Sequence, residues 1–279
     1  MEIKNHIIVE PVSNFKKVAL EALRGHWKSV FFIGFIYYIC FNLPGVFIDY
    51  FLGAFTSSQE AMSALMTGMP VEQWLQEYGN SLNSSSYVST IYSLLVGGPF
   101  ALGLTYVWLN IIRKKPIDAE LVFNGFSDFL RAFTLNIFRG AIIILGFMLF
   151  IVPGIYFYYR YCLAYYVLTD NPKISPIGAM RLSAVMTSGN KLKMFTLDLS
   201  FLGWLLLSVV VMVFVLGPIT MMFMTGNGSE LDMLFQTIAQ TVILALVLPF
   251  VFAYRNVSVA MLYRRVSEPL YAQLSSSSE

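Results

Sequence analysis

The chain has 279 residues, of which 57% are hydrophobic and 12% are charged. Soluble domains hold roughly 45–50% apolar and about 25% charged residues, so this composition excludes an ordinary soluble domain and favours a membrane protein with spans of about 20 residues each. The net charge of +2 carries little information, because a bilayer sorts charges by side.

The cations are distributed unevenly along the chain. None of the 18 lysines and arginines lies between Phe41 and Trp108, or between Phe201 and Tyr254. Cationic loops stay on the cytoplasmic side of a membrane. We therefore predict that the polar stretches 56–86 and 226–232 lie outside and that both termini are cytoplasmic. The expected location is a cytoplasmic membrane.

The first predicted element is an amphipathic helix over residues 13–26, which we expect to lie on the anionic inner leaflet. A first span over 29–55 follows, interrupted at Pro44-Gly45, and a second span covers 87–112. A surface helix is predicted over 118–131, ahead of forty apolar residues. That length suits a hairpin of two spans, 132–152 and 154–169, which turns at Pro153-Gly154.

The remaining predicted elements are a cytoplasmic helix and two spans. Residues 175–188 form the helix, with Pro176 at its first position and Gly189 as its stop. The fifth span covers 194–216 and breaks at Gly217-Pro218, and the last covers 234–263. The predicted fold is thus all-α: a polytopic helical membrane protein in which residues 1–279 form a single membrane domain, with six transmembrane helices as three hairpins and cytoplasmic amphipathic helices.

The ionisable residues of most interest inside the predicted spans are Asp198, Arg139, Arg160 and Arg255, because a charge there is costly unless it is paired or hydrated. Asp198 is an acid in the inner half of the fifth span, and Arg139 lies near the inner end of the third. We predict a structural ion pair between Asp198 and one of the embedded arginines, with Arg139 as the named candidate. The alternative is that Arg160 or Arg255 is unpaired and faces a cavity that binds an anionic headgroup or solute.

The positions of the inward spans give this cavity a third candidate residue. Arg160 and Arg255 follow Pro153 and Pro249 by seven and six residues, and Tyr106 follows Pro99 by seven. If the hairpins repeat, the three side chains converge. The predicted ligand-binding set is therefore Arg160, Arg255 and Tyr106, with a phosphate or carboxylate as the ligand.

The residues of common catalytic and metal centres are missing from the sequence. His6 and His26 are the two histidines, and both lie outside the spans. Cys40 and Cys162 are in apolar stretches, so they indicate buried thiols rather than a disulfide framework or a metal site. No HExxH, G-x-S-x-G or P-loop pattern occurs. We expect no enzyme activity, no cofactor and no metal.

Several segments together resemble the DUF975 family of bacterial integral membrane proteins. They are Ala22–Trp27, Ile151–Ile155, Tyr166–Pro172, Gly189–Lys191 and Phe195–Trp204. The chain departs from the family pattern at Pro249-Phe250, where the family has Pro-Tyr, and at Leu262-Tyr263, where it has Phe-Tyr. The family is functionally uncharacterised, so the resemblance implies a fold and a membrane location. It also marks Asp170, Asn171, Pro172 and Asp198 as motif residues.

The expected function is that of a non-enzymatic membrane protein. It would bind membrane lipid or a membrane-active peptide, or act as partner of another membrane protein or of a second copy of itself. No nucleic-acid partner is expected. The alternative is a transporter for a small anionic or amphipathic solute, with the proline-broken spans forming a site at the midplane.

Overall fold

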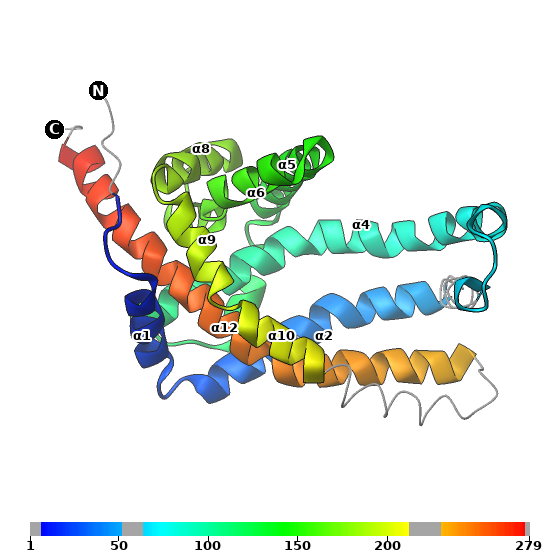
Figure 1. Ribbon diagram of the computed structural model, residues 1–279. Coiled ribbons are helices and arrows are strands. Elements are labelled where there is room, and N and C mark those ends of the chain that lie inside the picture. The colour runs from blue at the N-terminus through cyan, green and yellow to red at the C-terminus, as the bar shows by residue number, and fades with distance from the viewer. Residues whose placement is uncertain (1–6, 52–63, 212–229, 277–279) are drawn as a thin grey trace. The chain divides into compact units, whose positions relative to one another are not determined.

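A computed structural model describes residues 7–51, 64–211 and 230–276 (Figure 1). Every regular element in these ranges is a helix, as predicted. The chain divides into two compact units: a first unit of residues 1–34, 97–206 and 248–279, and a second unit of residues 35–96 and 207–247. The elements are α1 Val12–Leu23, α2 Trp27–Phe51, α4 Val71–Ile112, the 3₁₀ helix η1 Ala119–Phe126, α5 Phe129–Leu149, α6 Ile151–Arg160, α7 Ala164–Asp170, α8 Pro176–Thr187, α9 Lys191–Leu199, α10 Leu202–Val211 and α12 Glu230–Ser276.

Three helical segments in the described part of the chain are long and apolar enough to cross a membrane: Trp27–Phe51, Val88–Ile112 and Phe129–Leu149. Two consecutive segments of α12, Thr237–Leu246 and Leu248–Gln273, pass the same test only as a pair. The chain is therefore built as a membrane protein, with three or four such spans in the described residues rather than the six predicted.

The difference arises at the fourth and fifth predicted spans. Residues 154–169 do not form one helix, because the chain breaks between α6 and α7. The predicted fifth span over 194–216 contains α9 and α10, and its end, with Gly217-Pro218 and the loop 226–232, lies outside the described residues. Part of the predicted outer loop 56–86 is helical, since α4 begins at Val71.

Helix α2 continues through Pro44, where the sequence predicted an interruption. Proline has no N–H, so the carbonyl oxygen of Cys40, one turn earlier, loses its helical partner. The hydroxyl of Tyr92 on α4 donates a hydrogen bond to this oxygen at 2.8 Å. A freed backbone group in a span is tolerated when a neighbouring side chain satisfies it. The contact with Tyr92 thus allows α2 to remain helical at Pro44.

This compensation makes Tyr92 important only while Pro44 is present. We expect Tyr92→Phe to lower the free energy of unfolding by about 1 kcal/mol, a usual value for one hydrogen bond between membrane helices. In a Pro44→Ala background the alanine N–H supplies the missing partner, so the same change should cost less. Melting temperatures of the four proteins in one detergent measure this coupling, and equal losses in both backgrounds would contradict it.

Helix α1 corresponds to the amphipathic helix predicted over 13–26. Phe15, Ala19 and Leu23, one turn apart, are buried in the first unit, whereas Val18 is exposed. The Nζ of Lys16 lies 4.6 Å from the centroid of the Phe201 ring. Most of the apolar face of α1 therefore packs against protein rather than facing a membrane.

The segment predicted as a surface helix over 118–131 is divided. Its first part is η1, and its last residues begin α5. Gly125 lies against the backbone of Pro99, and Gly103 lies against that of Val122, with no room for a Cβ on either glycine. Two glycines thus allow η1 to approach α4 backbone to backbone, which a surface helix with side chains on all faces would not do.

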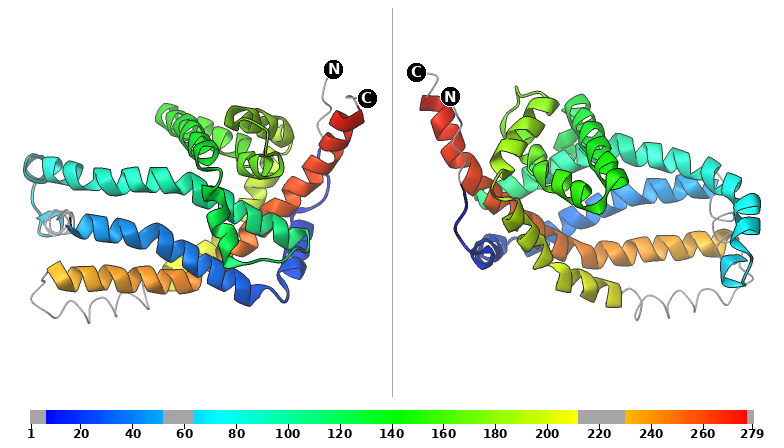
Figure 2. Two further views of the ribbon diagram at one scale, coloured as in Figure 1. Left: turned by 180° about the vertical axis from the view of Figure 1, so that it is seen from behind. Right: turned by 45° about the horizontal axis from the view of Figure 1, so that its top comes forward.

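Helices α5 and α6 form a tight antiparallel hairpin (Figures 1 and 2). The turn is at Phe150, three residues before the predicted Pro153-Gly154. Pro153 lies in the first turn of α6, where a helix needs no N–H. Gly154 and Gly146 lie at the contact between the two helices, and a Cβ on Gly154 would overlap the ring of Phe147. Proline and glycine therefore start α6 and bring it close to α5.

Helices α7 and α8 follow this hairpin and pack against each other and against α5. The residues Ala164–Thr169 of α7 are all buried. Helix α8 begins as expected for its sequence: the Oγ of Ser175 accepts a hydrogen bond from the N–H of Gly178 at 3.1 Å, and Pro176 is the first helical residue. Gly189, with φ of +76°, ends the α8 region and turns the chain into α9.

Candidate functional site

A bidentate ion pair in the first unit joins α9 to α12. The guanidinium of Arg255 donates from Nε to Asp198 Oδ1 at 2.8 Å and from Nη2 to Asp198 Oδ2 at 2.9 Å. The Tyr159 hydroxyl donates to the same Oδ2 at 3.1 Å, and Arg255 Nη2 donates to the Tyr158 hydroxyl at 3.2 Å. The side chains of Arg255 and Asp198 are 26% and 22% exposed, so this bidentate pair is largely withdrawn from solvent.

Arg255 therefore takes the place for which the sequence analysis named Arg139, and it is not the unpaired cation of the proposed cavity. The physical reason is geometric: α9 and α12 bring Asp198 and Arg255 within bonding distance, whereas Arg139 on α5 lies between two aromatic rings. Its guanidinium carbon is 5.8 Å from the centroid of Tyr158 and 5.6 Å from that of Tyr165. Its Nε is buried and has no hydrogen-bond partner.

Arg160 lies in a different setting, at the end of α6. Its Nη1 donates to the hydroxyl of Tyr156, one turn earlier, at 3.3 Å. The ammonium of Lys191, the first residue of α9, is 4.7 Å from the centroid of the Tyr156 ring. The Nε of Arg160 is buried without a hydrogen-bond partner. Among the ion pairs of the described residues, none includes Arg160 or Lys191. We call Tyr156, Arg160 and Lys191 the cationic cluster.

Tyr106, the third predicted ligand residue, is on α4, where its charged neighbours are Asp128, Arg131 and Asp170. Arg160, Arg255 and Tyr106 thus have different partners, and they do not build the central cavity that the sequence analysis proposed. That proposal assumed three equivalent hairpins, but α6 is a short helix that ends at Arg160 while α12 continues far beyond Arg255.

A second polar centre forms around the motif residues Asp170 and Asn171. Arg113 Nη2 donates to both carboxylate oxygens of Asp170, at 2.8 and 2.7 Å, and the Tyr263 hydroxyl donates to Oδ2 at 2.9 Å. Asn171 Nδ2 donates to the hydroxyl of Tyr271 at 2.7 Å. The Asp170–Asn171 pair therefore links the end of α7 to the end of α4 and to α12.

Arg131 extends this second centre to α5. Its Nη1 pairs with Asp128 at 3.0 Å, and its Nη2 donates to the carbonyl oxygens of Asn171 and Ile174 at 3.0 and 2.9 Å. These bonds hold the loop between α7 and α8. Carbonyl acceptors and one carboxylate thus occupy Arg131 within the protein, so it stabilises the fold rather than offering a free cation.

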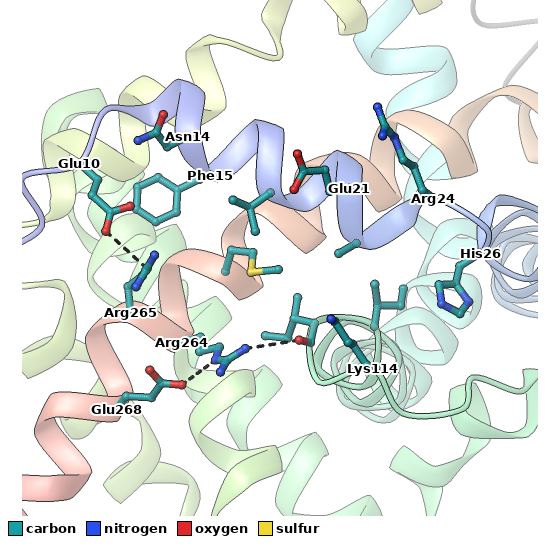
Figure 3. Close-up of a pocket in the computed structure, with 15 residues that line it drawn as sticks. Glu10, Asn14, Phe15, Glu21, Arg24, His26, Lys114, Arg264, Arg265 and Glu268 are labelled. Atoms are coloured by element: carbon teal, nitrogen blue, oxygen red, sulfur yellow. Dashed lines mark hydrogen bonds and ion pairs between the residues drawn. The ribbon is translucent and has the colours of Figure 1, made fainter.

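A pocket of about 650 Å³ lies between α1, the end of α4 and α12 (Figure 3). Arg265 lies 3.5 Å from Glu10, and Arg264 pairs with Glu268 at 2.6 Å. The other charged residues that line it are Glu21, Arg24 and Lys114, and His26 lies there too. Its walls carry both signs of charge, and two of its acids are already paired with arginines. None of the predicted site residues lines this pocket, and its charge pattern favours no ligand of one sign.

The polar groups of the described residues include no candidate metal site, but they include one contact that the sequence did not predict. In residues 7–51, 64–211 and 230–276, no three His, Cys, Asp or Glu side chains lie where they could hold a metal ion. The sequence analysis did not name Lys191 as a site residue. Tyr156 and Arg160 are four residues apart, so a helical reading puts them on one face. Nothing in the spacing could have placed Lys191, which comes from another helix, beside them.

Residues 137–269 match the protein family described as a protein of unknown function, DUF975. This range contains the Asp198–Arg255 pair, the cationic cluster and Asp170. The comparison with curated proteins found no match, and that with solved structures found none either.

The structure predicts that Asp198 is needed for stability. Asp198→Asn leaves the guanidinium of Arg255 partly buried without its counter-charge, and we expect a loss of roughly 2–3 kcal/mol, between the values for surface and fully buried pairs. Adding Arg255→Gln to Asp198→Asn should restore part of this loss. The melting temperature in detergent is the measurement.

Arg264→Gln is the matched control, because it breaks an ion pair on the same helix whose side chains are 49% and 57% exposed. We expect that control to change the melting temperature little. A melting temperature of Asp198→Asn equal to that of Arg264→Gln would show that the Asp198–Arg255 pair is effectively hydrated.

Proposed function

We propose that the protein is a helical membrane protein that binds the phosphate of an anionic lipid through Arg160 and Lys191. The match to the DUF975 family covers residues 137–269, and the function of that family is unknown. The observation that carries this proposal is the cationic cluster. Two cations contact one phenol from different helices, and the Nε of Arg160 is buried with no protein acceptor. A buried polar atom of a charged group without a partner is rare and calls for one.

Electrostatics favours an anion at this place. Arg160 and Lys191 raise the local positive potential, and no carboxylate of the described residues pairs with either of them. Arginine binds phosphate through two parallel N–H donors, and lysine adds a point charge. Tyr156, which is exposed, adds a hydroxyl that can hydrogen-bond to a phosphate oxygen.

The apolar surroundings favour a lipid over a free anion. Ile155, on the same helix as the cluster, is exposed, and so is Leu192, next to Lys191. Anionic headgroups lie at the surface of the cytoplasmic leaflet and attract juxtamembrane cations. We propose accordingly that the membrane is the bacterial cytoplasmic membrane and that the cluster and both termini face its inner leaflet, which the distribution of lysine and arginine supports.

The test measures retention of phosphatidylglycerol by the purified protein, with phosphatidylcholine as the neutral comparison, by native mass spectrometry. The variant is Arg160→Gln with Lys191→Gln. Each cation near a charged surface contributes about 1 kcal/mol, so the double change should weaken phosphatidylglycerol binding roughly 30-fold. The control is Arg181→Gln with Lys173→Gln, which removes the same charge from exposed positions on α8 and just before it. We expect this control to bind like the wild type.

Two further results decide the nature of the ligand. Inorganic phosphate added in excess should not displace the lipid if the acyl chains contribute to binding, and displacement would identify a site for a free anion. Equal phosphatidylglycerol retention by the wild type and by Arg160→Gln with Lys191→Gln would overturn the proposal. A melting temperature of the double variant close to that of the wild type excludes misfolding as the cause of any loss.

A further inference from the structure

We infer that the α5–α6 hairpin is re-entrant: it enters the bilayer from the side of the cationic cluster, turns at Phe150 among the acyl chains of one leaflet, and returns to the same side. The sequence predicted two full spans here, and α5 by its length and composition could form one of them. The inference concerns how the hairpin meets the membrane, and it uses Arg160 and Lys191 only as charges that avoid the hydrocarbon. It therefore does not need the lipid headgroup of the proposed function.

The end of the hairpin is apolar and uncovered. Eight of the nine positions from 144 to 152, all except Gly146, carry exposed apolar side chains, with exposed fractions from 47% at Phe147 to 77% at Met148. They are Ile144, Leu145, Phe147, Met148, Leu149, Phe150, Ile151 and Val152. We call these residues the apolar tip. A contiguous exposed patch of this kind marks a membrane or protein contact. Large aliphatic and aromatic side chains, with no charge among them, match the acyl chains of lipid.

The base of the hairpin is covered by protein instead. Ala132 and Leu135, in the first half of α5, are buried, and α8 packs against α5 and α7 (Figure 2). Ser183 and Thr187 of α8 donate to the carbonyl oxygen of Arg160, both at 3.1 Å. The cover thus reaches the last residue of α6. Arg181 of α8 is exposed, as expected for a helix at the aqueous side of the membrane.

The distance between the tip and the cations fits one leaflet. Arg160 is nine residues after Ile151, about 14 Å along a helix, and Tyr156, which Lys191 contacts, is about 8 Å from the same end. The hydrocarbon core is about 30 Å thick, so one leaflet contributes about 15 Å. With the two cations near the headgroups, the tip lies about 8 to 14 Å deeper along the helix, which is within one leaflet.

A fully spanning hairpin would place the same groups badly. If Phe150 were at the outer surface, Arg160 would lie near the midplane, and the ammonium of Lys191 beside Tyr156 would be still closer to that outer surface. Lysine and arginine at that depth are costly unless they are paired. The break between α6 and α7 adds to this, since α6 has 10 residues and cannot cross a membrane alone.

A re-entrant hairpin leaves the sides of the termini unchanged. Removing two spans from six keeps an even number, so both termini remain on one side. The distribution of lysine and arginine cannot distinguish the two topologies, because the turn at Phe150 carries no cation that would assign it to one side. The measurable difference is the environment of the tip, which is lipid in one case and external water in the other.

The experiment is accessibility of single cysteines to a membrane-impermeant maleimide in intact cells and in inside-out vesicles. Cys40 and Cys162 are first replaced by alanine, and Met148→Cys, Phe150→Cys and Val152→Cys are made one at a time. These side chains are exposed, so the changes remove little packing. Gln76→Cys serves as the outer control and Lys173→Cys as the inner control, both at exposed positions.

We expect the three tip cysteines to resist labelling from both sides and to react once the protein is in denaturing detergent, while each control reacts from its own side. Labelling of Phe150→Cys in intact cells would establish the spanning hairpin and overturn the inference. Labelling only in inside-out vesicles would show a hairpin that never enters the bilayer, which overturns it too. Loss of phosphatidylglycerol specificity in the Arg160 and Lys191 variant does not alter this readout, so the two proposals fail separately.

Discussion

Asp198 and Arg255 meet through two hydrogen bonds between α9 and α12 that are largely withdrawn from solvent, and two neighbouring tyrosines bond to that pair. Tyr159 bonds to the carboxylate and Tyr158 to the guanidinium, so α6 is tied to α9 and α12 through the same contact. In a low-dielectric interior an unpaired charge is far more costly than a paired one, which makes a single bidentate pair an effective constraint on how helices meet. Arg139 packs against Tyr158 at the edge of this network and keeps its Nε unbonded.

The motif residues of the DUF975 family resemblance take their meaning from such contacts. Asp170 and Asn171 bind Arg113, Tyr263 and Tyr271, and thereby join α4, α7 and α12 at one point. Asp198 joins α6, α9 and α12 in the same way, through Tyr159 and Arg255. A family model restricted to residues 137–269 covers both centres except for their partners Arg113, Arg131 and Tyr271. These motif residues therefore contribute to the packing of the first unit.

The proposed lipid site uses cations that form no ion pair within the described residues. The two polar centres satisfy Arg113, Arg131 and Arg255 within the protein, whereas Arg160 and Lys191 contact tyrosines and pair with no carboxylate of the described residues. They lie between a base covered by α8 and a tip that no described element covers. Charge at the boundary and apolar surface beyond it are the two properties that a protein needs to hold an anionic lipid and to enter one leaflet. The same short segment of chain thus carries both proposals.

The sequence is sufficient to assign the helical membrane class, because composition and hydropathy are summed over many residues and do not depend on which residues pair. It also indicated the start of α8 at Ser175-Pro176 and its end at Gly189, since caps are local. The sequence could not show that Asp198 pairs with Arg255 rather than Arg139, or that Lys191 contacts Tyr156. The two residues of each pair lie on different helices, 57 and 35 positions apart along the chain. Residue spacing predicts neighbours only within one helix. The predicted helix break at Pro44 was wrong because the compensating hydroxyl of Tyr92 belongs to another helix. The predicted single span over 154–169 was wrong because an apolar stretch does not show whether protein or lipid will cover it. These contacts follow from the tertiary fold. A buried polar group is satisfied by whichever partner the packing of the helices brings within about 3 Å of it.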